Sequence, residues 1–380
     1  MDYQLSDEQL ALQDMAYKFA VNELAPVAQE CDREEKVPRE LIKKGAEIGF
    51  TGMLVPEEQG GLGGGWLEVA LVTEQLSRID MGLGLVIIGA GFGSEHIILY
   101  GTDEQKNEYL PKLVNGDAIF AGAFTEPNAG TDVASVRTRA ERVGDEYVIN
   151  GSKMFITNGS ICDYIIALCV TNPDAEKRTQ RHSLILIDAN QDGVNRTKIR
   201  GKMGIRASDT AEITFEDVHV PTTNLIGEEG KGFYQLLHFF DQTRIMIAAQ
   251  GVGIAQGALD LALKYTKERK TFGQPLIANQ SIQFELAEMA TRVELARDIT
   301  YKAAWTTDHG HLDPSLNAMA KFYTGENAVW VVDKALQMHG GYGYIDEYDI
   351  QRFYRDAKIL EIYEGTKEAE KITIARRLMK

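Results

Sequence analysis

The sequence predicts an α+β fold in three consecutive parts. These are an N-terminal α-helical domain at 1–119, a central β domain at 120–226 and a C-terminal four-helix bundle at 227–380. Apolar residues recur at helical spacing in the first part, short apolar runs alternate with turns in the second, and long helical patterns return in the third. No helix of useful length separates the central strands, so we expect an antiparallel barrel or sandwich there.

Length and composition are typical of a soluble globular protein. The chain has 380 residues, of which 44% are hydrophobic and 25% are charged, which is enough for two or three domains. The 40 basic and 56 acidic residues give a net charge of −16, which argues against nucleic acid or an anionic membrane as the main partner. The sequence has no run of about 18 apolar residues, so no membrane span is expected.

The N-terminus and the cysteines favour a cytoplasmic protein. The stretch Met1-Asp2-Tyr3-Gln4 is not basic, and no apolar signal core follows it. The three cysteines form no C-x-x-C pair, which favours a reducing compartment over a disulfide framework. The seven histidines show no metal-binding spacing, so no metal site is expected.

Capping signals place the helices of the first part. Ser6 with Gln9, and Thr102 with Gln105, match the capping box in which a hydroxyl and an amide satisfy each other's backbone N–H groups. Between them, 60–65 is a glycine-rich loop. It could cradle a phosphate, although a surface turn between helices is the favoured interpretation.

The central part contains a strong turn signal. Asn150-Gly151 lies between two apolar runs and predicts a type I′ hairpin, because both positions of that turn need positive φ. Further strands are expected at 165–170, 184–187 and 211–215. After these, helices are predicted near 233–267, 279–308, 314–339 and 366–378, with lengths that suit an antiparallel bundle.

Two stretches of the β domain could hold a ligand. Residues 124–132 end a strand in a turn rich in hydroxyl and backbone donors, which can grip a flat polar ring or a phosphate. Phe155 and Thr157 lie two apart, so in a strand they share a face on which a ring could stack and form a hydrogen bond. An ordinary turn and a half-buried strand face are the alternatives.

The C-terminal part contains three further candidates. Asp241 and Arg244 interrupt an apolar helix and either pair with each other or grip a polar ligand chain. Arg269 stands where a helix stops, so it can bind a pyrophosphate or the helix C-terminus. The glycines 340–341 after Gln337 allow a ligand to approach the backbone, or form a plain helix cap.

Glu364 is the candidate base. It precedes Gly365 at the entrance of the last predicted helix, although a solvated surface carboxylate is the commoner role for such a glutamate. The glycines at 89, 91 and 93 follow an apolar run, but their spacing is G-x-G-x-G without a βαβ unit, which argues against a dinucleotide-binding Rossmann fold.

The order of several motifs carries more information than any one of them. The chain contains, in this order, Thr-Glu-Pro-Asn-Ala-Gly-Thr-Asp, Phe-Ile-Thr-Asn-Gly, Phe-Glu-Asp-Val-His-Val-Pro, Glu-Arg-Lys-Thr-Phe-Gly, Gly-Gly-Tyr-Gly, Arg-Asp-Ala-Lys and Tyr-Glu-Gly-Thr. Over nearly its whole length it closely resembles the FAD-dependent acyl-CoA dehydrogenase family. The resemblance implies the same three domains, FAD between the β and C-terminal domains, and a homotetramer built as a dimer of dimers.

The resemblance also implies roles for individual residues. One subunit would hold the flavin through Phe124, Thr125, Thr131, Phe155 and Thr157. The partner subunit would contact the FAD phosphates and adenosine through Arg269, Phe272, Gln280, Gln337 and Gly341, while Thr366 would touch the FAD beside the base. Substrate contacts would come from Ile88, Thr131, Asp241, Arg244, Tyr363 and Gly365.

Glu364 matches the base of most members of the family. Some members place the base at the position of Thr243, which cannot abstract such a proton. Phe155 replaces the tryptophan that many members have, and Lys367 and Glu368 stand where a serine and a polar or acidic residue are common. Ile88 lies near a position that is acidic in some members, which favours an apolar pocket.

The implied reaction is α,β-dehydrogenation of an acyl-CoA thioester to the 2-enoyl-CoA. Glu364 would remove the α-proton as the β-hydride passes to flavin N5, and an electron-transfer flavoprotein would accept the electrons. Burial of the ligand is expected to raise the pKa of Glu364 towards neutrality. Short-chain, medium-chain, branched and alicyclic acyl groups remain open. The alternatives are an enoyl-CoA reductase, a decarboxylating dehydrogenase, an oxidase or a non-catalytic acyl-CoA-binding scaffold.

Overall fold

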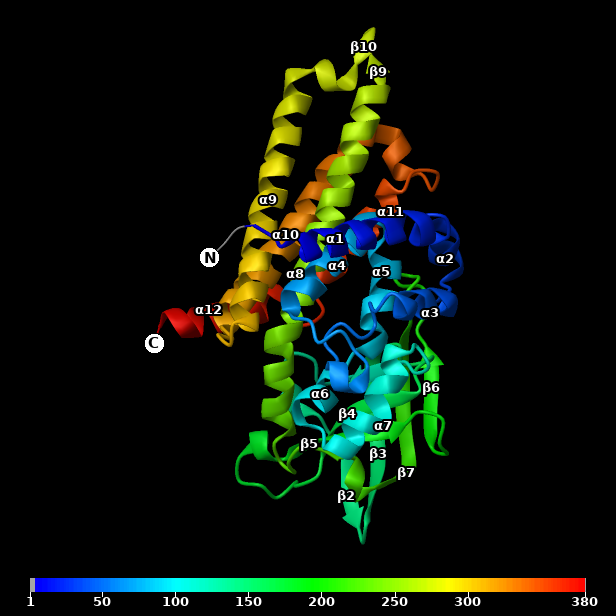
Figure 1. The fold of residues 1–380 in the computed structure, drawn as a ribbon, viewed down its shortest axis with the longest axis vertical. Helices are drawn as coiled ribbons and strands as arrows, with labels where there is room; N and C mark the ends of the chain where they lie inside the picture. The colour runs from blue at the N-terminus through cyan, green and yellow to red at the C-terminus, as the bar shows by residue number, and fades with distance from the viewer. Residues whose placement is uncertain (1–3, 380) are drawn as a thin grey trace.

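The computed structural model describes residues 4–379. Residues 1–3 lie outside this range. They belong to the non-basic N-terminal stretch from which a cytoplasmic location is predicted. The molecule is elongated, with the β-sheet in one half, a layer of helices across the middle and a small β-hairpin at the opposite tip (Figure 1). The long helices α8, α9 and α10 run along the molecule; α8 extends from beside the sheet to the hairpin, while α9 and α10 lie in the middle and upper part (Figure 1).

The first part is helical, as predicted, and its capping boxes are present. Gln9 N donates to Ser6 Oγ at 3.1 Å and Gln105 N donates to Thr102 Oγ1 at 3.2 Å. The helices are α1 Asp7–Phe19, α2 Ala28–Glu34, α3 Arg39–Glu47, α4 Trp66–Ile79, α5 Met81–Ile88, α6 Glu95–Tyr100 and α7 Asp103–Val114.

The glycine-rich loop at 60–65 leads into α4. There the Asp308 carboxylate accepts hydrogen bonds from the N–H groups of Trp66 and Leu67 at 2.7 and 2.9 Å. These helix N-terminal donors are therefore already in use, which supports the turn interpretation over a phosphate cradle.

The central part forms one eight-stranded sheet. Its path is β6-β7-β3-β2-β4-β5-β8, and β1 pairs with β4 beside it. The strands are β1 Phe120–Ala123, β2 Arg139–Val143, β3 Glu146–Thr157, β4 Tyr164–Val170, β5 His182–Asp188, β6 Val194–Lys198, β7 Thr210–Pro221 and β8 Leu225–Ile226.

The sheet differs from a closed antiparallel barrel in two respects. The pairs β1–β4 and β2–β4 are parallel, because the β2–β3 hairpin is inserted in the chain between β1 and β4. Within residues 4–379, the end strands β6 and β8 each pair on one side only, so the sheet is not closed. The predicted class, with a β domain between two helical parts, is confirmed.

The hairpin prediction at Asn150-Gly151 is wrong. Both residues lie inside β3, and the turn between β2 and β3 is Gly144-Asp145. Asn150 instead exchanges two hydrogen bonds with Asp217, at a bulge in the neighbouring strand β7. Gly151 has φ 150°, and a Cβ there would lie 2.6 Å from Thr138 Oγ1. Glycine at this position therefore allows close contact with Thr138 and does not form a turn.

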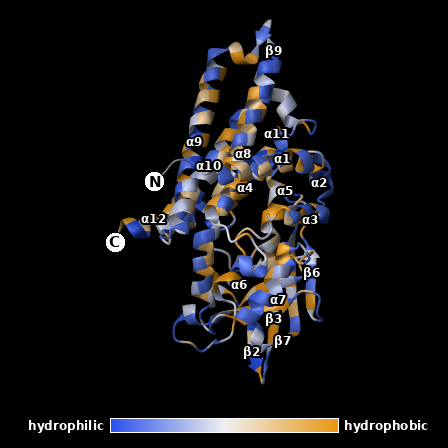
Figure 2. Ribbon diagram, viewed as in Figure 1, coloured by the Kyte–Doolittle hydropathy of each residue, from blue (hydrophilic) through white to orange (hydrophobic). Residues whose placement is uncertain are grey.

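The last part contains the four predicted helices and one more. They are α8 Gly232–Glu268, α9 Gln280–Asp308, α10 Pro314–His339 and α12 Lys367–Leu378, with the unpredicted α11 Ile350–Ala357 between the last two. The strands β9 Lys270–Thr271 and β10 Gln274–Pro275 form the hairpin at the tip (Figure 1). Along α9 hydrophobic and hydrophilic residues alternate, as expected for a helix with one buried face (Figure 2).

Two hydrophobic cores cross the predicted domain limits. One packs α1, α4 and α5 against the C-terminal helices, and it also takes in Ile205 and Ala207 from the β part. The other packs the sheet against α6, α7 and the first turns of α8. The boundaries at 119/120 and 226/227 coincide with the changes between helix and strand, and as limits of independent domains they stay predictions.

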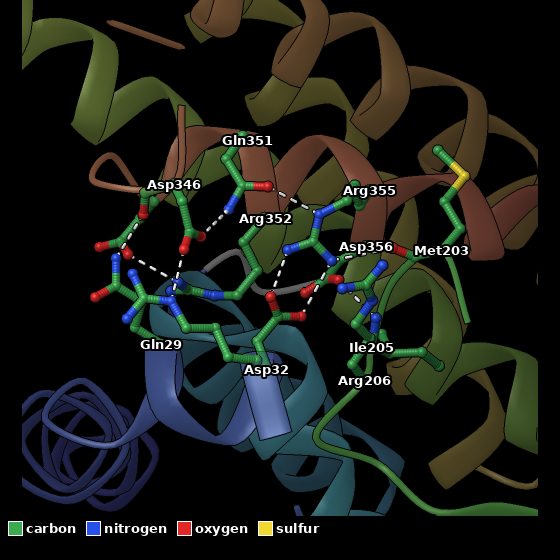
Figure 3. Close-up of polar contacts among 12 residues, drawn as sticks. Gln29, Asp32, Met203, Ile205, Arg206, Asp346, Gln351, Arg352, Arg355 and Asp356 are labelled. Carbon is green, nitrogen blue, oxygen red and sulfur yellow. Dashed lines mark hydrogen bonds and ion pairs between the residues drawn. The ribbon is translucent and has the colours of Figure 1, made fainter. Parts of the chain in front are cut away.

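A buried polar network also joins the three parts (Figure 3). On α11, Arg352 Nε donates to Asp80 Oδ2 at 2.8 Å, and both side chains are almost fully buried. Asp356 Oδ1 accepts the Ile205 N–H at 2.6 Å, while Arg355 pairs with Asp32 of α2. Burial and the neighbouring Asp80 carboxylate raise the pKa of Asp356.

Two helical stretches are long and apolar enough to be compared with membrane spans. They are Met81–Tyr100 and Gly232–Glu268, and 72% and 83% of their most apolar windows are buried inside the protein. Such burial is typical of core helices in globular proteins.

We expect Arg352→Ala to lower the free energy of unfolding by about 3–5 kcal/mol, because it leaves the Asp80 carboxylate buried without its cation. Arg33 provides the control, since its ion pair with Asp346 is about half exposed on both sides. Arg33→Ala should cost less than about 1 kcal/mol. Denaturant midpoints of the two variants measure the difference, and equal midpoints would contradict the assignment.

Candidate active site

Glu364 lies in a strained loop between a 3₁₀ turn at Lys358–Glu361 and α12. Its φ is 55°, and that of Gly365 is 99°. A Cβ on Gly365 would lie 2.1 Å from Glu370 Oε1, so only glycine fits behind the carboxylate. Thr366 then begins the helix, with its hydroxyl accepting the Ala369 N–H at 3.3 Å. Left-handed backbone at a non-glycine residue is uncommon and is enriched at functional sites.

The Glu364 side chain points at the middle of α8. Thr243 Oγ1 donates to Glu364 Oε2 at 2.8 Å. Burial raises the pKa of Glu364 to about 7, while the Thr243 hydrogen bond and the positive charges of Arg244 and Lys321 act in the opposite direction. A carboxyl group with a pKa near neutrality can both accept and release a proton at physiological pH.

Lys321 supports this loop from α10. Its side chain is 1% exposed, and its ammonium donates to the Gly365 carbonyl. Burial lowers the pKa of Lys321 to about 8, while Glu370 and Glu364 act against this change. Lys321 therefore holds the loop and places a positive charge beside the candidate base.

Asp241 and Arg244 pair with each other, as one of the two sequence interpretations predicted. Arg244 Nε also donates to Glu370 Oε1 of α12 at 3.0 Å, and both side chains are buried. Charged groups on α8, α10 and α12 thus surround the loop that carries Glu364, residues 362–366. Sequence reasoning missed Lys321 and Glu370, because their partners are brought together only by helix packing.

Tyr363 and Ile88 are the residues predicted to border the acyl group. The Tyr363 hydroxyl donates to Gln250 Oε1 of α8. Ile88 lines a small cavity of about 40 Å³ between the N-terminal helices and α8. The cavity is mainly apolar, as expected, but the carboxyl-bearing Glu95 also lines it. No motif marked Glu95 in the sequence.

The β domain presents an exposed aromatic ring. Phe155 is 67% exposed and has φ 60° at a bulge in β3, with Thr157 two residues on and Ile156 buried on the opposite side. Thr131 is exposed and Thr125 is half-buried in the preceding turn. An exposed ring on strained backbone is suited to stacking on a planar ligand.

Phe124 differs from these residues. Its ring is buried among Phe92, His96, Phe239 and Phe240, so only its backbone is left to face a cofactor. The adjoining turn is held by Glu126, which forms a buried ion pair with Lys153 at 3.0 Å and accepts the Thr138 hydroxyl at 2.7 Å.

The second group of candidate cofactor residues lies beyond α8. Arg269 and Gly341 line a cavity of about 480 Å³, and the Arg269 guanidinium lies over the Tyr342 ring. A Cβ on Gly340 or Gly341 would meet no atom within 4 Å, so the backbone is open to a ligand. Gln280 and Gln337 are exposed nearby in the fold, and Phe272 is fully exposed at the β9–β10 turn.

The two groups do not converge within one chain. Helix α8 begins beside β5 and ends next to Arg269, and its 37 residues span roughly 55 Å. In Figure 1 the β9–β10 hairpin and the sheet occupy opposite halves of the molecule. One cofactor could use both groups only if they came from different copies of the chain.

The helix–sheet–helix fold, with the half-buried Glu364 carboxyl and two groups of candidate cofactor residues, defines a class of cofactor-dependent enzyme. Models of the acyl-CoA dehydrogenase N-terminal, middle and C-terminal domains match residues 6–117, 121–218 and 230–379. The chain therefore belongs to the acyl-CoA dehydrogenase family. It is an oxidoreductase, and its cofactor is FAD.

Similar proteins cover the full length of the chain. It is 44% identical over 382 residues to "Acryloyl-CoA reductase (NADH)" of Anaerotignum propionicum, covering all of this chain and 96% of the relative. It matches the butyryl-CoA dehydrogenase structure of Megasphaera elsdenii at 38% identity and TM-score 0.96, with both chains fully covered. A structure described as "Electron transferring flavoprotein of Acidaminococcus fermentans: Towards a mechanism of flavin-based electron bifurcation" matches at 40% identity and TM-score 0.97, again with full coverage of both chains.

The residues present fit FAD. The exposed Phe155 ring offers a stacking surface, while Arg269 and the open glycine backbone offer partners for a pyrophosphate. Among residues 4–379, no group of three His, Cys, Asp or Glu side chains is placed to hold a metal ion.

We expect Arg269→Ala to lose most of its bound FAD, because the phosphates lose a charged hydrogen-bond partner. Arg292→Ala is the matched control, since Arg292 lies on the surface of α9 and pairs with Glu288. The ratio of flavin to protein absorbance after purification checks this. A normal ratio in Arg269→Ala would show that Arg269 does not hold the cofactor.

Proposed function

We propose that this enzyme interconverts a short acyl-CoA thioester and its 2-enoyl-CoA, with Glu364 moving the α-proton. The observation that carries the proposal is the half-buried Glu364 carboxyl, which is held in left-handed backbone and hydrogen-bonded to Thr243. Thr243 stands where some family members carry their base. Here its hydroxyl donates a hydrogen bond to Glu364, the proposed base. When bound, FAD exchanges the β-hydride with the substrate.

The backbone N–H of Glu364 also offers the substrate a hydrogen-bond donor. Among residues 4–379, no acceptor is in hydrogen-bond range of the Glu364 N–H. We propose that this N–H binds the thioester carbonyl, where negative charge develops as the α-proton leaves. Asp241 and Arg244 would lie along the CoA chain, and Tyr363, Gly365 and Ile88 would border the acyl group.

Two copies of the chain would complete each FAD site. One copy supplies Thr125, Thr131, Phe155, Thr157 and Thr366, and the other supplies Arg269, Phe272, Gln280, Gln337 and Gly341. The separation of the two groups along α8 supports this arrangement. A homotetramer made as a dimer of dimers satisfies it, and it would also cover Phe272, which is fully exposed in the single chain.

The physiological direction has two candidates. Similarity to a butyryl-CoA dehydrogenase favours dehydrogenation, and similarity to an acryloyl-CoA reductase favours the reverse. The same residue serves both, since ionised Glu364 removes an α-proton and protonated Glu364 returns one. An electron-transfer flavoprotein is the proposed electron partner, supported by the similar structure of that description. The three free, buried cysteines support a reducing, cytoplasmic setting.

Glu364→Gln tests the base. We expect the variant to keep its FAD and to lose at least about a hundredfold in the rate at which butyryl-CoA reduces the flavin under anaerobic conditions. Glu368→Gln changes an exposed carboxylate four residues away and should leave the rate unchanged. Near-normal flavin bleaching by Glu364→Gln would refute the assignment.

The pH dependence tests the electrostatics of the site. Dehydrogenation needs ionised Glu364, so its rate should rise with pH through about 7. Lys321→Met removes a charge that lowers the pKa of Glu364, so this rise should move to higher pH and turnover near neutrality should fall severalfold. Lys334→Met, on the outer part of α10, is the control. An unmoved pH profile in Lys321→Met would show that Lys321 does not tune the base.

A further inference from the structure

Glu95 places a carboxyl group in the apolar cavity beside the base. The cavity of about 40 Å³ is otherwise lined mainly by apolar residues, among them Trp66, Val69, Ile88, Leu113 and Met246. Glu95 Oε2 accepts the Gly93 N–H at 2.8 Å. Burial raises the pKa of Glu95 to about 7, and the neighbouring charge that raises it further is the Glu364 carboxylate.

This cavity lies next to the reaction centre. Met246 is one helical turn along α8 from Thr243, the residue that binds Glu364, so the two side chains share a face of the helix. Ile88, which the family resemblance places at the acyl group, lines the same cavity.

A purely structural role accounts for only part of this arrangement. Glu95 is in the first turn of α6, where an acidic side chain stabilises a helix N-terminus. Such first-turn carboxylates normally face water, where they keep their hydration. Here the carboxyl group is half-buried at the cavity, and beside the hydrogen bond from the Gly93 N–H its oxygens have further acceptor capacity for a bound molecule. Strongly shifted carboxyl groups in a cavity are typical of functional sites.

We propose that Glu95 determines substrate specificity by binding a hydrogen-bond donor at the distal end of a short acyl chain. A hydroxyl or an ammonium group would satisfy the carboxyl group, whereas a distal carboxylate would be repelled by Glu95 and Glu364 together. The cavity has room for a group of about the size of a water molecule, so the chain must be short. This inference rests on the proposed acyl-CoA activity.

The test compares four acyl-CoA thioesters of equal chain length with the FAD-loaded enzyme. The thioesters are pentanoyl-, 5-hydroxypentanoyl-, 5-aminopentanoyl- and glutaryl-CoA, and the measurement is kcat/KM for anaerobic flavin reduction. A hydrogen bond to an ionised group contributes enough to predict a preference of about tenfold or more for the hydroxyl or ammonium substrate over pentanoyl-CoA. Glutaryl-CoA should be the poorest substrate. Comparing kcat/KM for the hydroxyl and ammonium substrates identifies which donor Glu95 binds.

Glu95→Gln separates substrate recognition from the structural hydrogen bond to Gly93. Its amide oxygen can still accept the Gly93 N–H, so the fold and the bound FAD should persist. The preference for the ammonium substrate should fall to near parity, and glutaryl-CoA should improve. Glu108→Gln alters an exposed residue of α7 and should keep the parent ranking.

The outcomes separate two kinds of failure. Pentanoyl-CoA as the best parent substrate, or an unchanged ranking in Glu95→Gln, would overturn the role of Glu95 alone. If none of the four thioesters nor butyryl-CoA reduced the flavin of the parent enzyme, the proposed function would fail as well. The parent ranking is decisive even if Glu95→Gln does not fold.

Discussion

The buried charges of α11 hold the three parts of the chain in one arrangement. Arg352 reaches Asp80 among the N-terminal helices, Arg355 reaches Asp32 of α2, and Asp356 takes the N–H of Ile205 from the β part. Each of these groups would be costly to bury without its partner. The network therefore stabilises one relative arrangement of the three parts. Helix α11 leads, after a single 3₁₀ turn, into the loop that carries Glu364, so the same network sets where that loop begins.

The chemistry of the site follows from a balance at Glu364. Burial favours its neutral form, whereas Thr243, Arg244 and Lys321 favour the carboxylate, and the result is a pKa of about 7. The same positive charges are themselves stabilised by Glu370 and Asp241, so the candidate base belongs to a network in which α8, α10 and α12 each contribute. A proton can then move in either direction near neutral pH. Relatives described as a dehydrogenase and as a reductase are consistent with one scaffold that serves both directions.

Local sequence signals succeeded where neighbouring residues alone decide the structure. The capping boxes at Ser6 and Thr102 and the four long C-terminal helices formed as expected, because hydrogen bonds within one turn and helical periodicity need no distant partner. Asn150-Gly151 failed because its conformation depends on Asp217 and Thr138, which lie on other strands. The open, partly parallel sheet was missed for the same reason, since strand pairing is a non-local property.

The sequence by itself determined the three-part fold class, the family and the candidate base, because these are encoded in periodicity and in the order of short motifs. The pairing of Asp241 with Arg244 was foreseen as an alternative, whereas only the tertiary structure decided it. The structure also revealed Lys321, Glu370 and Glu95, none of which stands in a motif. Each gains its role from a partner on another helix or from a cavity between helices. Desolvation and charge pairing depend on distances in space, and spacing along the chain does not report them.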